Sequence, residues 1–213
     1  MTTLYLSNDA ALSADEWDTL IQSVKYFAPL VSKAWKLPAV SISTVPVDGA
    51  WRVIVTDQKR VTGATGYHTV EAGIHVAYCS PKAVAGKIFG LYHRPMTVKG
   101  KVIRPATYSS GLITTVCHEI AEMLCDPKIA TVSAKDSQSR TWLVEVCDHV
   151  FGNYITETFN GHVCIMPDVT TPSFYDLKGK APYSLTGAAT APFTMTPKGY
   201  GYYKTATGGL VKL

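Results

Sequence analysis

The amino-acid sequence predicts an α+β fold: an N-terminal helix, a small mixed sheet, a second helix, and a C-terminal part rich in strands. The evidence is two segments with helical hydrophobic spacing, and short β-branched runs between and after them. Hydrophobic residues make up 46% and charged residues 17% of the 213 residues, which is typical of a globular chain. This length fits a single domain over residues 1–213, with parts at 1–109, 110–176 and 177–213.

The first helix is predicted over residues 13–36. Ser13 and Glu16 form the Ser-x-x-Glu pattern of a capping box. Apolar residues then recur at helical spacing, at Trp17, Leu20, Ile21, Val24, Phe27 and Val31. Pro29 lies within this pattern and predicts a kink or a break into two helices.

Strands are predicted next, at Ala39–Val45 and Trp51–Thr56. Asp48-Gly49 between them is typical of a hairpin turn, so we expect these two strands to pair. A further strand is predicted at Gly73–Cys79. Residues 80–109 are rich in glycine, proline and basic residues, which indicates a long loop or insertion of functional importance.

The second helix is predicted from Ser110 to Cys125, ending before Pro127. It carries His118-Glu119-x-x-Glu122, one residue different from the His-Glu-x-x-His signature of zinc peptidases. At 100° per residue, His118 and Glu122 lie side by side on a narrow polar stripe and can bind one ion. Glu119 lies at the flank of the stripe, where it can orient a metal-bound water. The remaining residues form a wide apolar face for the core.

A metal site explains the charge of this helix better than a solvated face does. No Lys or Arg occurs between Pro105 and Pro127, although Glu119, Glu122 and Asp126 lie close together in sequence. Carboxylates gathered without a cation repel one another unless a bound ion compensates them.

One helix supplies only two ligands, so a third is expected from elsewhere. Glu145 is the first candidate, about twenty residues downstream of the motif. Asp148 would then accept the free N–H of His118 and fix its tautomer. The two acids can also exchange roles, and if their segment is a strand they point to opposite faces, so that only one ligates directly.

The other predicted elements are shorter. Thr141–Val150 and His162–Met166 are apolar runs that indicate strands or a short helix, and Tyr200–Lys204 with Leu210–Leu213 predict a hairpin. The other five histidines lack ligand spacing and are expected at the surface or with ordinary partners: His68, His75, His93, His149 and His162. The five cysteines form no close pairs, so we expect buried thiols rather than disulfides or a thiolate zinc site.

The motif, followed by Asp126-Pro127 and then by Glu145-Val146-Cys147-Asp148, resembles a zincin-like His-Glu-x-x-Glu family of mostly uncharacterised bacterial and phage proteins. Further matches are Asp57, Gly66-Tyr67-His68 and residues 167–176, so the resemblance covers most of the chain, to about residue 203. A weaker similarity is to the exordium-like phosphate-induced proteins. The resemblance implies a zincin-like metallopeptidase fold with Glu119 as the base. Glu122 in place of the second histidine adds negative charge, which leaves calcium or another divalent ion open besides zinc.

The expected function is therefore a metal-dependent peptidase, with zinc held by His118, Glu122 and Glu145 or Asp148, and with a peptide or protein as substrate. The alternative is an inactive structural or assembly protein of the virion type that keeps the metal site. Basic residues at 82–104 and 178–212 carry no nucleic-acid-binding motif, so nucleic acid is not an expected partner. No secretory signal or membrane span is recognisable, so we expect a cytoplasmic or virion-associated location.

Overall fold

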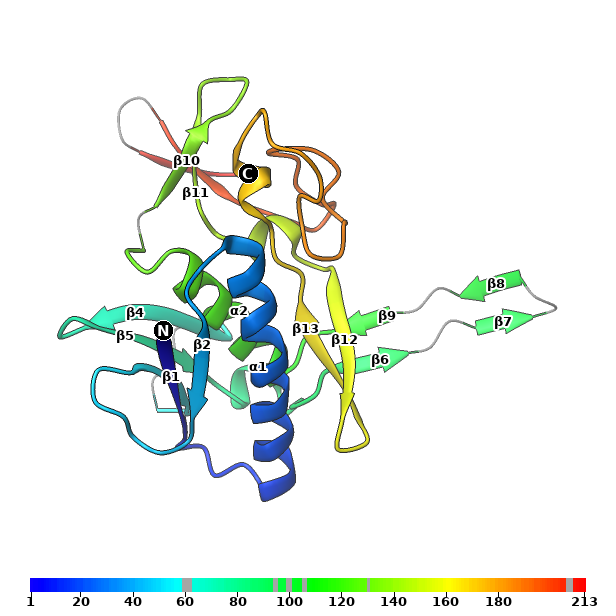
Figure 1. Ribbon diagram of the computed structural model, residues 1–213. Helices are drawn as coiled ribbons and strands as arrows, with labels where there is room; N and C mark the ends of the chain where they lie inside the picture. The colour runs from blue at the N-terminus through cyan, green and yellow to red at the C-terminus, as the bar shows by residue number, and fades with distance from the viewer. Residues whose placement is uncertain (59–62, 94–95, 99–100, 105–106, 130, 206–208) are drawn as a thin grey trace.

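The structure is a computed structural model, and it describes residues 1–58, 63–93, 96–98, 101–104, 107–129, 131–205 and 209–213. It has helices, a five-stranded sheet and several smaller sheets, which confirms the α+β class (Figure 1). One hydrophobic core draws residues from Leu4 to Ala189. All five cysteines are buried free thiols, as expected. No helix among the described residues is both long and apolar enough for a membrane span.

The main sheet has the strand order β2-β1-β3-β5-β4. Its strands are β1 (Thr2–Asn8), β2 (Val40–Ser43), β3 (Trp51–Val55), β4 (Gly66–Glu71) and β5 (Ile74–Cys79). Strands β1, β2, β3 and β5 are parallel, whereas β4 runs antiparallel to β5 at the edge.

The predicted hairpin of the second and third strands is wrong. Both strands pair with β1, on opposite sides and parallel to it, so β1 separates them. The turn at Asp48-Gly49 does form, with a φ of +72° at Gly49. A turn reverses the chain but does not decide which strands pair. Residues 2–8, for which no strand was predicted, form β1 and lie between β2 and β3.

The first helix, α1 (Ala14–Trp35), begins at the predicted capping box. The Glu16 amide donates to Ser13 Oγ at 3.4 Å, and the Ser13 amide donates to Glu16 Oε2 at 2.9 Å. The helix continues through Pro29, so the predicted break into two helices is wrong. Phe27, Ala28 and Val31 are fully buried in the core around the proline, and this packing offsets the lost hydrogen bond.

The second helix, α2 (Leu112–Cys125), starts two residues later than predicted and has Gly111 as its N-cap. Every residue of α2 except His118 is buried. The helix contacts β4 and β5 of the main sheet, α1, and strand β13 (His162–Pro167) of a second layer, which also contains β12 (Tyr154–Phe159). A helix enclosed in this way has no solvated face, so its polar side chains must find partners inside the protein.

Within residues 80–109, which were predicted to be a long loop or insertion, the described part of 91–109 forms an inserted arm of paired strands, whereas Val84 and Ile88 pack in the core. After a short 3₁₀ helix, η1 (Lys82–Val84), strand β6 (Leu91–His93) pairs with β9 (Thr107–Ser109), and β7 (Met96–Val98) pairs with β8 (Lys101–Arg104). Figure 1 shows this arm projecting from the body of the molecule beside β12 and β13.

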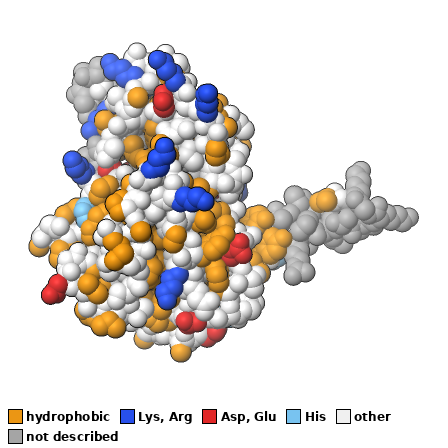
Figure 2. Space-filling view, viewed as in Figure 1, with side chains coloured by type: hydrophobic (Ala, Val, Ile, Leu, Met, Phe, Trp, Pro, Cys, Tyr) orange, Lys and Arg blue, Asp and Glu red, His pale blue; other side chains and the backbone are white. Residues whose placement is uncertain are grey.

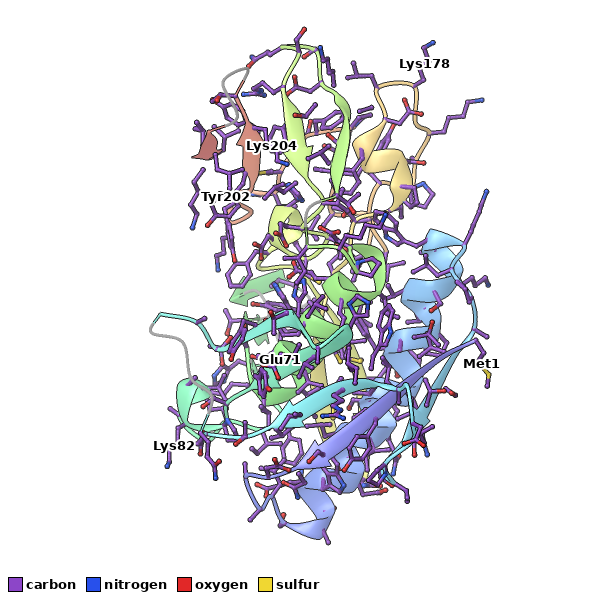
Figure 3. All side chains as sticks on the ribbon, turned by 90° about the vertical axis from the view of Figure 1, so that its left-hand side faces the viewer. Met1, Glu71, Lys82, Lys178, Tyr202 and Lys204 are labelled. Carbon is purple, nitrogen blue, oxygen red and sulfur yellow. The ribbon has the colours of Figure 1, made fainter. Side chains whose placement is uncertain are left out.

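A smaller sheet of four strands forms the opposite end of the chain. Its order is β10 (Val132–Lys135), β11 (Thr141–Leu143), β14 (Tyr202–Lys204) and β15 (Leu210–Lys212). Strands β14 and β15 form the predicted C-terminal hairpin, whose turn residues 207 and 208 lie outside the described residues. Figure 3 shows the strand with Tyr202 and Lys204 at one end of the molecule, away from Glu71 of β4. Two further 3₁₀ helices, η2 (Asp148–Val150) and η3 (Pro172–Tyr175), connect this sheet to the core.

Replacement of Ser13 with alanine is expected to lower the free energy of unfolding by about 1 kcal/mol, because the first turn of α1 loses its side-chain acceptor. Urea denaturation followed by circular dichroism measures this change. The control Ser13→Asp keeps an acceptor and should retain near wild-type stability. Equal losses in both variants would show that the capping box does not stabilise α1.

Candidate metal centre

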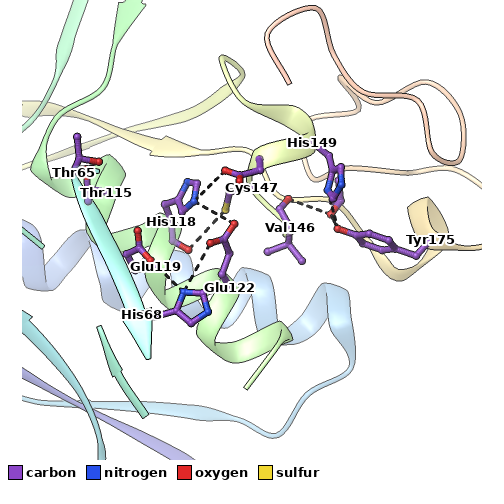
Figure 4. Close-up of polar contacts among 12 residues, drawn as sticks. Thr65, His68, Thr115, His118, Glu119, Glu122, Val146, Cys147, His149 and Tyr175 are labelled. Atoms are coloured by element: carbon purple, nitrogen blue, oxygen red, sulfur yellow. Dashed lines mark hydrogen bonds and ion pairs between the residues drawn. The ribbon is translucent and has the colours of Figure 1, made fainter. Parts of the chain in front are cut away.

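A cavity of about 540 Å³ lies over the polar side of α2. Its lining comes mainly from residues 63–68 at the start of β4, from α2, from the segment with Glu145 and Asp148, and from Tyr200 near the C-terminus, with Ser110 and Ile129 on either side of α2. The motif residues His118, Glu119 and Glu122 all line it, and Figure 4 shows them gathered with His68 of β4.

Two carboxylates approach the same nitrogen of His118. Glu122 Oε1 lies 3.2 Å and Asp148 Oδ1 lies 3.4 Å from His118 Nε2. The i,i+4 spacing on α2 places the first pair, as expected from the helical geometry. Asp148 was expected to accept a hydrogen bond from the ring nitrogen of His118 that does not bind the ion. Instead, Asp148 faces Nε2, the same nitrogen that Glu122 faces.

Glu145 and Asp148 lie on the same side of their segment. Strand β11 ends at Leu143, and the chain then turns at Val146 and Cys147 into η2. Residues three apart superpose in a 3₁₀-like turn, so both acids reach the cavity. Oxygens of Glu122, Glu145 and Asp148 lie within 4.8 Å of one another. The opposite-face arrangement expected for a strand therefore does not occur.

His68 belongs to the cluster, although it was expected at the surface or with an ordinary partner. Its Nδ1 lies 3.2 Å from Glu119 Oε2 and 3.9 Å from Glu122 Oε2, and it belongs to the edge strand β4 (Figure 4). Two residues earlier on the same face of the strand, Gly66 packs so tightly on α2 that an added Cβ would lie 2.7 Å from Thr115 Cγ2 and 3.0 Å from Glu119 Oε1. Glycine thus lets β4 approach the helix. The pattern Gly66-x-His68 could have indicated that His68 faces α2, because residues i and i+2 of a strand lie on the same face.

Tyr200 and Cys147 are further additions to the predicted set. Tyr200 lines the cavity and hydrogen-bonds to Asp148 through its side chain. Cys147 Sγ donates to the carbonyl of His118 at 3.9 Å and lies within ligand distance of His118 and Glu122. Burial raises the pKa of the Cys147 thiol well above its usual value, which keeps it a hydrogen-bond donor in the absence of an ion.

Asp126 is not part of the cluster. It caps α2 and accepts hydrogen bonds from the amide and hydroxyl of Thr131. Three of the other histidines have partners outside the site: His75 packs on Trp51, His149 contacts Tyr175, and His162 binds Asp15, while His93 is exposed on β6. His149 is fully buried rather than at the surface.

The electrostatics of the cluster are those of crowded, buried acids. Burial first, and then the neighbouring Glu122, raise the pKa of Glu145 to about 8 and that of Asp148 to about 7. Burial opposes charge on His118, but Glu122 and Asp148 outweigh it and raise the pKa of His118 well above its usual value. Among the described residues, the only cationic partners of Glu119, Glu122 and Asp148 within ion-pair distance are histidines.

Two oxygens in the cluster lack hydrogen bonds although they are buried. They are Glu122 Oε1 and Asp148 Oδ1, on residues that are 4% and 7% exposed. Both face His118 Nε2, but a single N–H cannot serve both oxygens, so a buried acceptor is left without a donor, and a cation between these oxygens and His118 Nε2 removes that cost. The nitrogen and oxygen donors that converge here are those used by zinc and other divalent cations. The residues therefore fit a divalent cation.

Comparison of the chain with protein-family models, with curated proteins and with solved structures finds no match. The resemblance to zincin-like proteins therefore remains a prediction from the motif residues.

The metal-free protein is expected to lose stability as pH rises from about 4 to about 8. Glu145 and Asp148 have higher pKa values in the folded than in the unfolded state, so the folded state binds more protons in this window and the free energy of unfolding falls as they dissociate. The raised pKa of His118 acts in the same direction, whereas burial lowers the pKa of His149 to about 4 and offsets part of the loss below about pH 6.5. Thermal melts in chelator should show the melting temperature falling by several degrees.

The control for this effect is Glu145→Gln, which keeps the shape of the side chain but removes its titration. The pH dependence of this variant should be flatter than that of the wild type. A wild-type melting temperature that rises steadily over the same window would contradict the assignment.

Proposed function

We propose that this protein is a metal-dependent hydrolase of peptide bonds with a zincin-like arrangement of its site. The observation that carries the proposal is the convergence of His118 Nε2, Glu122 Oε1 and Asp148 Oδ1 at a cavity large enough for a segment of substrate. A purely structural ion is usually enclosed by its ligands, whereas a catalytic ion keeps one position open to the cavity.

The cation is assigned to His118 and Glu122 of α2, with Asp148 and Glu145 completing the set. Zinc suits this mixture of imidazole and carboxylate, and the high carboxylate content also suits manganese or calcium. When bound, such a cation supplies Lewis acidity and lowers the pKa of water. Tyr200 positions Asp148 through its hydrogen bond, which leaves the other carboxylate oxygen directed to His118.

Glu119 is assigned the role of general base. It is 6% exposed, lines the cavity and lies one residue after His118, so it flanks the cation position without sharing the pair of oxygens that face His118. His68 orients Glu119 by the contact between Nδ1 and Oε2. A positioned carboxylate that takes a proton from water contributes about 10²–10⁴-fold to hydrolysis.

The substrate is assigned to the free edge of β4. In the main sheet β5 lies inside, between β3 and β4, and β4 is the outermost strand. An extended peptide can add to an edge strand through main-chain hydrogen bonds, and β4 runs directly along the cavity. No Lys or Arg occurs among the described lining residues, so a preference for acidic substrates is not part of the proposal.

The face seen in Figure 2 does not group its basic side chains as a nucleic-acid-binding face does. Figure 2 shows Lys and Arg side chains scattered singly over the visible face, separated by hydrophobic and neutral surface. A nucleic-acid-binding face usually groups its basic residues into a patch or stripe.

The variant Glu119→Gln is expected to keep its bound cation and to lose at least about 100-fold in kcat, because an amide cannot accept the proton. Cleavage of a peptide library by the zinc-loaded wild type and variant measures this loss. The matched control is Glu157→Gln, at an exposed acid whose partner is the hydroxyl of Tyr26, and it should retain wild-type activity.

Undiminished cleavage by Glu119→Gln would refute the role of Glu119. A wild type that binds zinc, depends on it for stability and cleaves no peptide with any divalent cation would establish the alternative, a structural metal site.

A further inference from the structure

We propose that the site holds two divalent cations, with Glu122 bridging them through its two oxygens. This inference rests on the first cation position of the proposed function and adds a second position formed by His68, Glu119 and Glu122.

The two oxygens of Glu122 face two different sets of donors. Oε1 lies 3.2 Å from His118 Nε2, and an oxygen of Glu122 is also within 4.8 Å of oxygens of Glu145 and Asp148. Oε2 instead lies 3.9 Å from His68 Nδ1. A carboxylate with one oxygen toward each of two donor sets has the arrangement of a bridge between cations about 3.5–4 Å apart.

The second set is a complete group of ligand atoms in its own right. His68 Nδ1, Glu119 Oε2 and an oxygen of Glu122 lie within 4.8 Å of one another. Their side chains are 10%, 8% and 5% exposed, so water cannot fully solvate their charges. They come from two elements, β4 and α2, held at close range by the glycine contact at Gly66.

The charge of the whole cluster favours two cations over one. It contains the four carboxylates of Glu119, Glu122, Glu145 and Asp148. Among the described residues, no Lys or Arg forms an ion pair with Glu119, Glu122 or Asp148. When cation binding ionises all four carboxylates, one divalent cation balances two of their negative charges, whereas two cations balance all four. The buried oxygens Glu122 Oε1 and Asp148 Oδ1 have only His118 Nε2 as a shared neighbour, and they point to a ligand at the first position.

The second position also implies regulation of the proposed reaction. It uses the carboxylate of Glu119, which the reaction needs as a base. Filling it therefore slows hydrolysis, so the protein is most active with only the first position occupied.

Titration of the metal-free, full-length protein with Mn²⁺ tests the proposal without any substrate. Equilibrium dialysis with metal analysis should give two equivalents bound per chain. Electron paramagnetic resonance of the loaded protein should show the closely spaced lines of an exchange-coupled pair, since a bridging carboxylate couples the two ions.

The variant His68→Val removes a donor from the second position only and suits a strand. It should bind one equivalent and show the spectrum of an isolated ion, while the control His162→Ala, at a histidine that binds Asp15, should still bind two. If His68→Val does not fold, as judged by circular dichroism, the spectrum of the wild type still decides the question.

One equivalent with an isolated-ion spectrum in the wild type overturns the second position and leaves the proposed function intact. Two equivalents retained by a folded His68→Val also overturn it, because the second ion then lies elsewhere. No binding of either Mn²⁺ or Zn²⁺ overturns both proposals.

Discussion

The structure depends on the burial of four carboxylates and two imidazoles between a helix and its surroundings. Helix α2 is enclosed by the main sheet, by α1 and by β13, so Glu119 and Glu122 have no route to bulk water except through the cavity. Charges held in this way must be paired, protonated or bound to cations. The neighbouring segments are arranged around this requirement: β4 brings His68, the turn before η2 brings Glu145 and Asp148, and Tyr200 contributes a hydrogen bond.

Much of the local structure was predictable because it depends on neighbours in sequence. The capping box at Ser13 and Glu16, the pairing of His118 with Glu122 and the C-terminal hairpin all follow from short-range geometry. The motif also predicted a downstream acid near the helix, and both Glu145 and Asp148 lie there.

The parts that sequence did not predict depend on contacts between distant segments. The place of β1 between β2 and β3 is set by which strands bury Leu4 and Leu6, and a turn at Asp48-Gly49 gives no information about it. His68 lies 51 residues from Glu119, and only the register of β4 on α2 brings them together. Tyr200 reaches the site because the chain returns to Asp148 through a backbone hydrogen bond from the Tyr200 amide.

In the proposed site, the carboxylates that would bind a cation also reduce its power to catalyse hydrolysis. Carboxylate ligands add negative charge and make a bound cation a weaker Lewis acid than imidazole ligands do, while they increase the affinity of the site for hard cations. Binding of a cation and proton transfer both use the oxygens of Glu119, so these two roles compete. Under the proposed function, the balance between the two uses of Glu119 determines whether the site stores a cation or hydrolyses a substrate.

The most direct test of the central claim is a crystal structure of the protein grown with zinc, with data collected at the zinc absorption edge. The account predicts an anomalous difference peak at about 2.0–2.2 Å from His118 Nε2 and from oxygens of Glu122 and of Asp148 or Glu145. Well-ordered side chains at this cluster with no anomalous peak, or zinc bound only elsewhere on the chain, would contradict it.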